Sequence, residues 1–99
     1  MDLYVTGKHL DLTDPIREQI ERRAEKFPKY FDRVSRVDVV VEKRGGHTYF
    51  VEYVVHIPGS EPIVATAKHD DLYAGIDGAG SKVEQQLRNF HAKLVDHKH

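Results

Sequence analysis

The sequence of 99 residues contains no cysteine. Disulfide bonds and thiolate metal sites are therefore excluded. The sequence also lacks an excess of charge of one sign, because 15 Lys and Arg oppose 16 Asp and Glu, for a formal net charge of -1. The whole molecule is thus no polycation, and any affinity for nucleic acid must come from segregation of its charges.

Long apolar runs are missing as well. No stretch approaches the about 18 consecutive apolar residues that a membrane span needs, and the first residues lack the basic-then-apolar pattern of a signal peptide. Charged residues make up 31% of the chain beside 39% hydrophobic residues, which is typical of a soluble globular protein. We therefore expect a cytoplasmic protein without a membrane partner.

The length of the chain predicts one domain with a single core beneath two helices. We assign residues 1–95 to this domain. The remaining residues, 96–99, have the sequence Asp96-His97-Lys98-His99, and we expect them to form a frayed C-terminal tail.

Alternating and helical periodicities predict four strands and two helices. Thr13-Asp14-Pro15 combines cap residues with a proline that the first helical turn tolerates, so a helix begins here and ends near residue 30, with Pro28 kinking its last turn. A second helix is predicted from Asp70 to Leu94. The expected strands lie near residues 3–7, 37–42, 49–57 and 63–68, with turns at 45–46 and 58–60.

Apolar residues at steps of three and four predict the buried face of each helix. In the first helix these residues are Ile16, Ile20, Ala24, Phe27 and Phe31. In the second they are Leu72, Ile76, Ala79, Val83, Leu87, Phe90 and Leu94. Three glycines, Gly75, Gly78 and Gly80, interrupt the second helix at a cost of roughly 0.5–1 kcal/mol each. We interpret them as points of close approach to the sheet or the other helix; close approach of an RNA backbone is the alternative.

The order of elements predicts an α+β fold. It reads β-α-β-β-β-α, and a helix connects the first two strands, so these strands should run parallel. The fold is then a two-layer sandwich in which a four-stranded sheet carries two parallel helices on one face.

Charges are segregated on both predicted helices. The cations on one flank of the first helix are Arg22, Lys26, Lys29 and Arg33, and the acids on the other are Glu18, Glu21 and Glu25. The corresponding polar stripe of the second helix consists of Lys82, Gln86, Asn89 and Lys93. We predict that both stripes share one helical face about 20 Å long, a size suited to several phosphates. A solvated surface without function remains the alternative.

The helix-free face of the sheet supports two further hypotheses. Tyr4 and Phe50 lie in segments that imitate the strand motifs of an RNA-recognition module, which stacks bases on exposed aromatic rings, although this chain ends in a helix where that module needs a strand. The same face also carries Val40, Val54 and Val64, which favours a self-association patch or a surface for another protein.

Motifs for catalysis or metal binding are not found in the sequence. The seven histidines show no helical pair at a spacing of four residues, and no clustered acid completes a metal site. Ser60 and Ser81 lack the context of a nucleophile elbow, and no phosphate-binding glycine loop lies between a strand and a helix. We therefore predict no enzyme, no metal and no cofactor.

A long block around Tyr73 carries a family resemblance. Residues 65–77, Ala65-Thr66-Ala67-Lys68-His69-Asp70-Asp71-Leu72-Tyr73-Ala74-Gly75-Ile76-Asp77, followed by Lys82 and Gln86-Leu87, are similar to the signature of the ribosome hibernation-promoting factor and ribosome-associated inhibitor (protein Y) family. Further matches are Val5-Thr6-Gly7, Leu12-Thr13, Ile16-Arg17 and Tyr30-Phe31-Asp32-Arg33. The resemblance runs essentially end to end and implies the same order of strands and helices.

This resemblance implies binding to the small ribosomal subunit, in the channel for messenger and transfer RNA, and inhibition of translation during stress. The matched cations that would contact ribosomal RNA are Arg17, Arg23, Lys26, Lys29, Lys68, Lys82 and Lys93. Helix geometry adds Arg22 and Arg88. Gln85 and Asn89 stand where such proteins often carry a cation, which weakens the second stripe. The resemblance leaves open whether the protein silences single ribosomes or pairs them, and whether the chain is a short form or an excised N-terminal domain.

Overall fold

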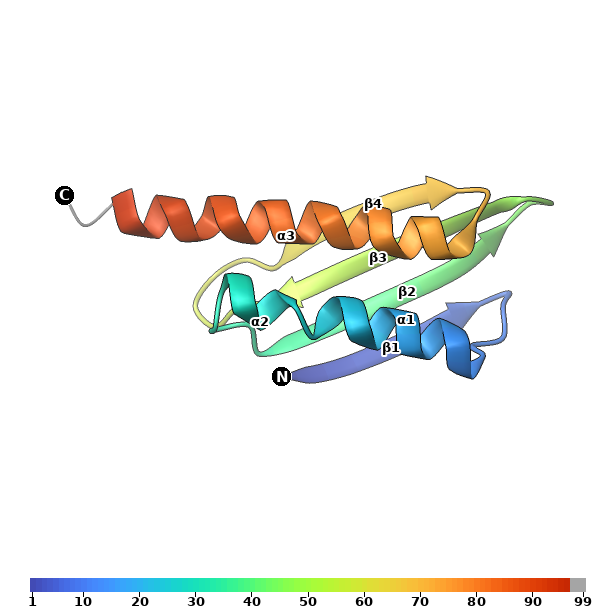
Figure 1. The fold of residues 1–99 in the computed structure, drawn as a ribbon, viewed down its shortest axis with the longest axis horizontal. Coiled ribbons are helices and arrows are strands. Elements are labelled where there is room, and N and C mark those ends of the chain that lie inside the picture. Colours follow the sequence, from blue (N-terminus) through green and yellow to red (C-terminus); the bar gives the residue numbers. More distant parts are fainter. Residues whose placement is uncertain (97–99) are drawn as a thin grey trace.

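The computed structural model describes residues 1–96. It contains four strands and three helices, in the order β1, α1, α2, β2, β3, β4, α3 (Figure 1). Their bounds are β1 Asp2–Lys8, α1 Asp14–Ala24, α2 Phe27–Tyr30, β2 Arg36–Arg44, β3 Thr48–His56, β4 Ile63–His69 and α3 Leu72–Asp96. Asp96, predicted to begin the tail, is thus the last residue of α3, and the rest of that tail lies outside the described residues.

The sheet confirms the predicted topology. Its strand order is β1-β2-β3-β4, with β1 parallel to β2 and the two following pairs antiparallel. The helices α1 and α3 run in the same direction on one side of the sheet (Figure 1). The fold is therefore the expected two-layer α+β sandwich.

The first predicted helix is broken into two. Thr13 caps α1 as expected, since its side chain accepts a hydrogen bond from the Ile16 amide. The helix ends at Ala24, and α2 begins at Phe27 after a turn. Pro28 explains the break, because it cannot donate to the Ala24 carbonyl and its ring would clash with that group. The prediction of one helix ending near residue 30 is wrong in this respect.

The last helix begins two residues later than predicted. The Asp71 carboxylate accepts hydrogen bonds from the Tyr73 and Ala74 amides, which is how an N-terminal cap satisfies free donors. At its other end α3 extends past the sheet (Figure 1). Leu94, predicted to be buried, is 39% exposed for this reason. None of the described helices has an apolar stretch long enough to cross a membrane.

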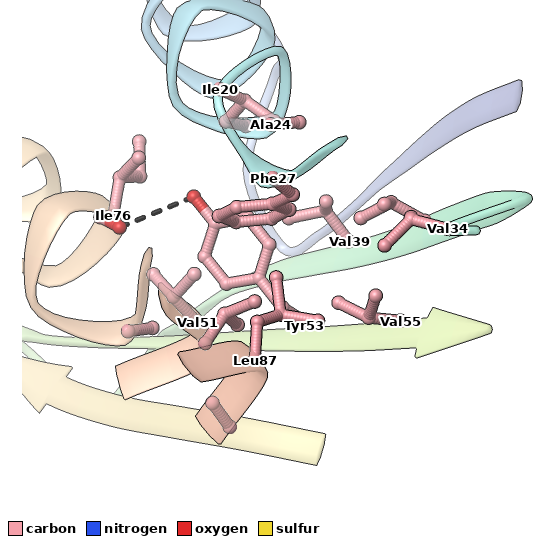
Figure 2. Close-up of a cluster of buried hydrophobic side chains, with 14 of the residues drawn as sticks. Ile20, Ala24, Phe27, Val34, Val39, Val51, Tyr53, Val55, Ile76 and Leu87 are labelled. Atoms are coloured by element: carbon pink, nitrogen blue, oxygen red, sulfur yellow. Dashed lines mark hydrogen bonds between the residues drawn. The ribbon is translucent and has the colours of Figure 1, made fainter. Parts of the chain in front are cut away.

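The core lies between the sheet and the helices (Figure 2). Every predicted apolar residue of the first helical segment is buried, and so are Leu72, Ile76, Ala79, Val83 and Leu87 of α3. Tyr53 lies at the centre, where its ring meets that of Phe27 edge to face and its hydroxyl donates to the Ile76 carbonyl over 3.2 Å. Burial raises the pKa of the Tyr53 hydroxyl, which therefore stays protonated and holds α3 to the sheet.

Candidate nucleic-acid interface

A cleft of about 540 Å³ lies where α1 and α2 face α3. Its lining residues are Gln19, Arg22, Arg23, Glu25, Lys26, Lys29 and Asp77. Its cations are Arg22 and Arg23 of α1, Lys26 in the turn before α2, and Lys29 of α2. Four of the predicted RNA contacts therefore lie at one site, and Arg22, Lys26 and Lys29 are exposed while Arg23 is half-buried.

Arg22 is held in a chain of hydrogen bonds that crosses the cleft. Its guanidinium donates to the side-chain oxygen of Gln19 over 2.7 Å. The Gln19 amide nitrogen in turn donates to the Asp77 carboxylate on α3, also over 2.7 Å. The acid on the opposite helix therefore fixes the amide, and the amide orients the guanidinium.

Arg23 has a different environment from Arg22. Its guanidinium lies 2.7 Å from the Glu84 carboxylate and donates to the Ser81 hydroxyl over 2.6 Å. Only 18% of the Arg23 side chain and 11% of the Glu84 side chain are exposed. Release of Arg23 to bind RNA would leave a nearly buried carboxylate without its partner. Arg23 therefore joins α1 to α3, and its contact with RNA, which the family resemblance implied, stays a prediction.

Gly80 makes this joint possible. A Cβ atom at this position would lie 2.5 Å from both Cγ and Nε of Arg23. Such separations are shorter than carbon and nitrogen atoms tolerate, so the glycine provides room for the arginine to cross. The interpretation of the helix glycines as points of close approach is confirmed for Gly80. A Cβ atom at Gly75 or Gly78 would make an ordinary contact with the sheet, 3.4 Å from Val51 Cγ2 or 3.9 Å from Ala67 Cβ.

The second polar stripe lies on the opposite flank of α3. Lys82 donates to the Thr66 carbonyl over 2.7 Å, and Gln86 donates to the Val64 carbonyl over 3.1 Å, both along the outer edge of β4. Lys93 lies farther along the same flank, in a shallow hollow beside Ile63 and Phe90. The prediction that both stripes form one helical face is therefore wrong, because α3 itself separates them.

The remaining predicted contacts are dispersed. Arg88 places its guanidinium 4.9 Å from the centre of the Tyr30 ring, which joins α3 to α2. Lys68 pairs in register with Phe50 and lies on the helix-free face of the sheet. Arg17 does not line the cleft. All three side chains are exposed, but the structure does not bring them together with Arg22.

On the helix-free face, arginines cover the two aromatic rings proposed for base stacking. Arg36 lies 4.4 Å from the centre of the Tyr4 ring, and Arg44 lies 3.9 Å from that of Phe50. Each guanidinium occupies part of the ring surface that a base would use, although Tyr4 is still 52% exposed. Stacking of bases on these rings stays a prediction.

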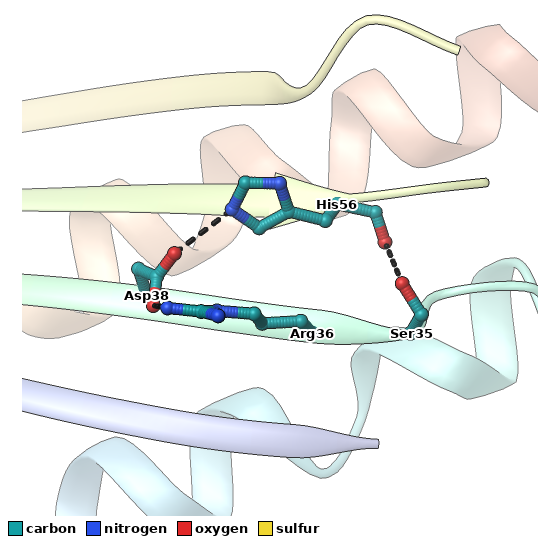
Figure 3. A network of polar contacts seen from close by, with 4 residues as sticks. All are labelled: Ser35, Arg36, Asp38 and His56. Carbon is teal, nitrogen blue, oxygen red and sulfur yellow. Dashed lines mark hydrogen bonds and ion pairs between the residues drawn. The ribbon is translucent and has the colours of Figure 1, made fainter. Parts of the chain in front are cut away.

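The same face carries a polar network (Figure 3). His56 lies 2.8 Å from the Asp38 carboxylate, which also accepts from Arg36 over 3.0 Å, while the Ser35 hydroxyl donates to the His56 carbonyl. Partial burial alone would raise the pKa of Asp38, but hydrogen bonds from Arg36 and His56 outweigh it and hold that pKa below its ordinary value. Asp38 of β2 therefore stays ionised at neutral pH, beside His56 of β3.

Sequence reasoning missed Gln19, Asp77 and Glu84. The contacts of Gln19 and Arg23 with α3 join residues 58 positions apart in the chain, so no helical spacing relates the partners. Among the side chains that the structure describes, in residues 1–94, His, Asp and Glu form no group that would hold a metal ion.

Comparisons with known proteins agree with the fold. Residues 3–95 match the family model described as "Sigma 54 modulation protein / S30EA ribosomal protein". The chain is 34% identical over 98 residues to the ribosome hibernation promoting factor of Azotobacter vinelandii, covering 97% of this chain and 88% of the relative. It is 37% identical over 99 residues to the factor of that name from Escherichia coli K12, covering 98% and 100%.

Two solved structures resemble this one. A ribosomal subunit interface protein from Coxiella burnetii superposes with a TM-score of 0.85 at 28% identity, covering 93% of this chain and 99% of that one. The N-terminal domain of Protein Y from Thermus thermophilus gives a TM-score of 0.81 at 30% identity, covering 91% and 99%.

Proposed function

The chain belongs to the Sigma 54 modulation protein / S30EA ribosomal protein family, and from that premise we propose that it is a ribosome hibernation factor. We propose further that it binds the small ribosomal subunit through RNA phosphates and blocks the channel for messenger and transfer RNA. Inhibition then needs no chemical step, because a folded domain in the channel excludes the RNA by its volume.

The cleft between α1 and α3 is the observation that carries the phosphate mechanism. Arg22, Lys26 and Lys29 are exposed around it, and none of them forms an ion pair with another side chain of residues 1–94. Arg23, the other cation of the cleft, is neutralised by Glu84. The cleft also contains Glu25 and Asp77, but its cations outnumber these acids, and this local excess of positive charge on a protein with a net charge of -1 supports RNA binding.

A charge-reversal variant tests this proposal. Lys26→Glu/Lys29→Glu should weaken binding to purified 30S subunits by about tenfold or more and reduce the dependence of log Kd on log salt by roughly two. Both side chains are exposed, so the domain should keep its fold. Sedimentation with 30S subunits at several salt concentrations measures both quantities.

Lys8→Glu/Lys43→Glu is the matched control. These lysines are exposed on β1 and β2, away from the cleft, and the variant makes the same change in net charge. It should bind 30S subunits nearly as the unaltered chain does. Equal losses for the two variants would refute the cleft as the RNA contact, and binding that is absent or insensitive to salt would refute the phosphate mechanism itself.

A second candidate function is self-association or protein binding through the helix-free face of the sheet. Tyr4 and Val64 are 52% and 47% exposed there, and they lie in the same row across the four strands. Light scattering over a range of concentrations tests it, with Val64→Glu as the disrupting variant. A monomer at every concentration would argue against self-association.

A further inference from the structure

The hydrogen-bond chain across the cleft has a polarity that permits one arrangement only. A carboxylate accepts and a guanidinium donates, so the Gln19 amide satisfies both neighbours only with its nitrogen toward Asp77 and its oxygen toward Arg22. Gln19 is partly buried between the two helices, which further limits its movement. One side chain on α3 thus sets the direction of a guanidinium on α1.

In this orientation most N–H donors of the Arg22 guanidinium do not contact Gln19. A guanidinium has five N–H donors, and the contact with Gln19 uses the Nη2 group alone. The remaining donors suit bidentate binding of a phosphate. Because the guanidinium is already held at the mouth of the cleft, a phosphate would not have to order it.

We propose that Gln19 and Asp77 are positioning residues that hold Arg22 ready for one phosphodiester group of RNA. The inference rests on the proposed function, since it concerns how the same cleft binds phosphate. The proposal means that Asp77, although negatively charged, strengthens the binding of a negatively charged phosphate. Electrostatics alone assigns Asp77 the opposite effect, because its charge repels phosphate, and this difference in sign makes the proposal testable.

Two variants of Asp77 have equal charge and differ in the hydrogen bond. Asp77→Asn keeps an oxygen that accepts from Gln19, whereas Asp77→Ala has none. Both remove the negative charge from the cleft. We expect Asp77→Ala to bind 30S subunits about three- to tenfold more weakly than Asp77→Asn, which is the order of magnitude for ordering one long side chain. Equal affinities for the two variants would overturn the proposal.

Gln19→Leu tests the other half of the chain. It should weaken binding to 30S subunits by a similar factor while the salt dependence keeps its slope, because Arg22 retains its charge. In an Arg22→Ala background, Gln19→Leu should have no further effect. Thr48→Val is the control, since Thr48 is exposed on β3 and does not line the cleft.

The outcomes separate the two proposals. Additive losses for Gln19→Leu and Arg22→Ala would overturn the positioning role and leave the ribosome-binding function standing. Failure of the unaltered chain to bind 30S subunits would overturn both. Thermal unfolding of each variant is recorded alongside, and if Asp77→Ala does not fold, the double-variant comparison of Gln19 and Arg22 decides the question alone.

Discussion

Gly80→Ala should destabilise the unaltered chain but stabilise a variant in which Arg23 is replaced by alanine. In the interior of a helix, alanine is favoured over glycine by about 0.5–1 kcal/mol. Here the added Cβ would lie 2.5 Å from Arg23 Cγ and Nε and 3.0 Å from its Cδ. These atoms belong to the middle of the side chain, so Arg23 must leave its place beside Glu84.

The cost of displacing Arg23 should exceed the gain in helix propensity. The ion pair spans 2.7 Å, and its side chains are 18% and 11% exposed, so its loss strands a nearly buried carboxylate. Breaking a fully buried pair costs about 3–5 kcal/mol, and we take about 2–4 kcal/mol for this partly exposed one. After the gain from the helix, Gly80→Ala should lower the free energy of unfolding by about 1–3 kcal/mol.

Arg23→Ala removes the obstacle. In that background Gly80→Ala should raise the free energy of unfolding by about 0.5–1 kcal/mol. Urea unfolding followed by far-UV circular dichroism measures both values, since the chain has no tryptophan for fluorescence. Gly78→Ala is the control: its Cβ would lie 3.9 Å from that of Ala67, an ordinary contact, and should stabilise both backgrounds. If Gly80→Ala stabilises the unaltered chain as much as Gly78→Ala does, the reasoning is refuted.

Two further predictions concern the sheet. Because the pKa of Asp38 is lowered in the folded state, its contribution to stability is present above the unfolded pKa and is lost as the pH falls through the folded one. Asp38→Asn should therefore be less stable than the unaltered chain at pH 7, and the difference should shrink below about pH 4, as measured by urea unfolding at both pH values. Gly45→Ala should destabilise the β2–β3 turn by about 1 kcal/mol, because Gly45 has a φ of 62°. Gly46→Ala should be nearly neutral, since Gly46 has no left-handed φ and open space around it, and urea unfolding measures both turn variants.

The order of elements and most of the core could be predicted because they depend on local periodicity. Alternation in β2 and β3 and the spacing from Ile16 to Phe31 each specify a buried face whatever the rest of the chain does. The errors arose where two local rules compete. The apolar spacing continues through Phe27 and Phe31, but Pro28 ends α1 at Ala24. Leu94 also fits the apolar spacing of α3, but it is exposed because the helix extends past the sheet.

The candidate site was less predictable than the fold. Helical spacing identified Arg22, Lys26 and Lys29 as one stripe, and the structure places them at one cleft. The same reasoning could not separate Arg22 from Arg23, although they are neighbours in the chain. Their difference depends on Asp77 and Glu84, which reach α1 only through the packing of α3 beside it.

The contacts that Lys82 and Gln86 make along β4 have a consequence for solubility. The outward carbonyls of an edge strand are free to pair with a strand of another molecule. In β4, however, the carbonyls of Thr66 and Val64 already accept hydrogen bonds from side chains of α3. A strand of another molecule could pair with β4 only after it had displaced the Lys82 ammonium and the Gln86 amide from these carbonyls. The side chains of α3 thus hinder edge-to-edge association of this sheet with a strand of another molecule.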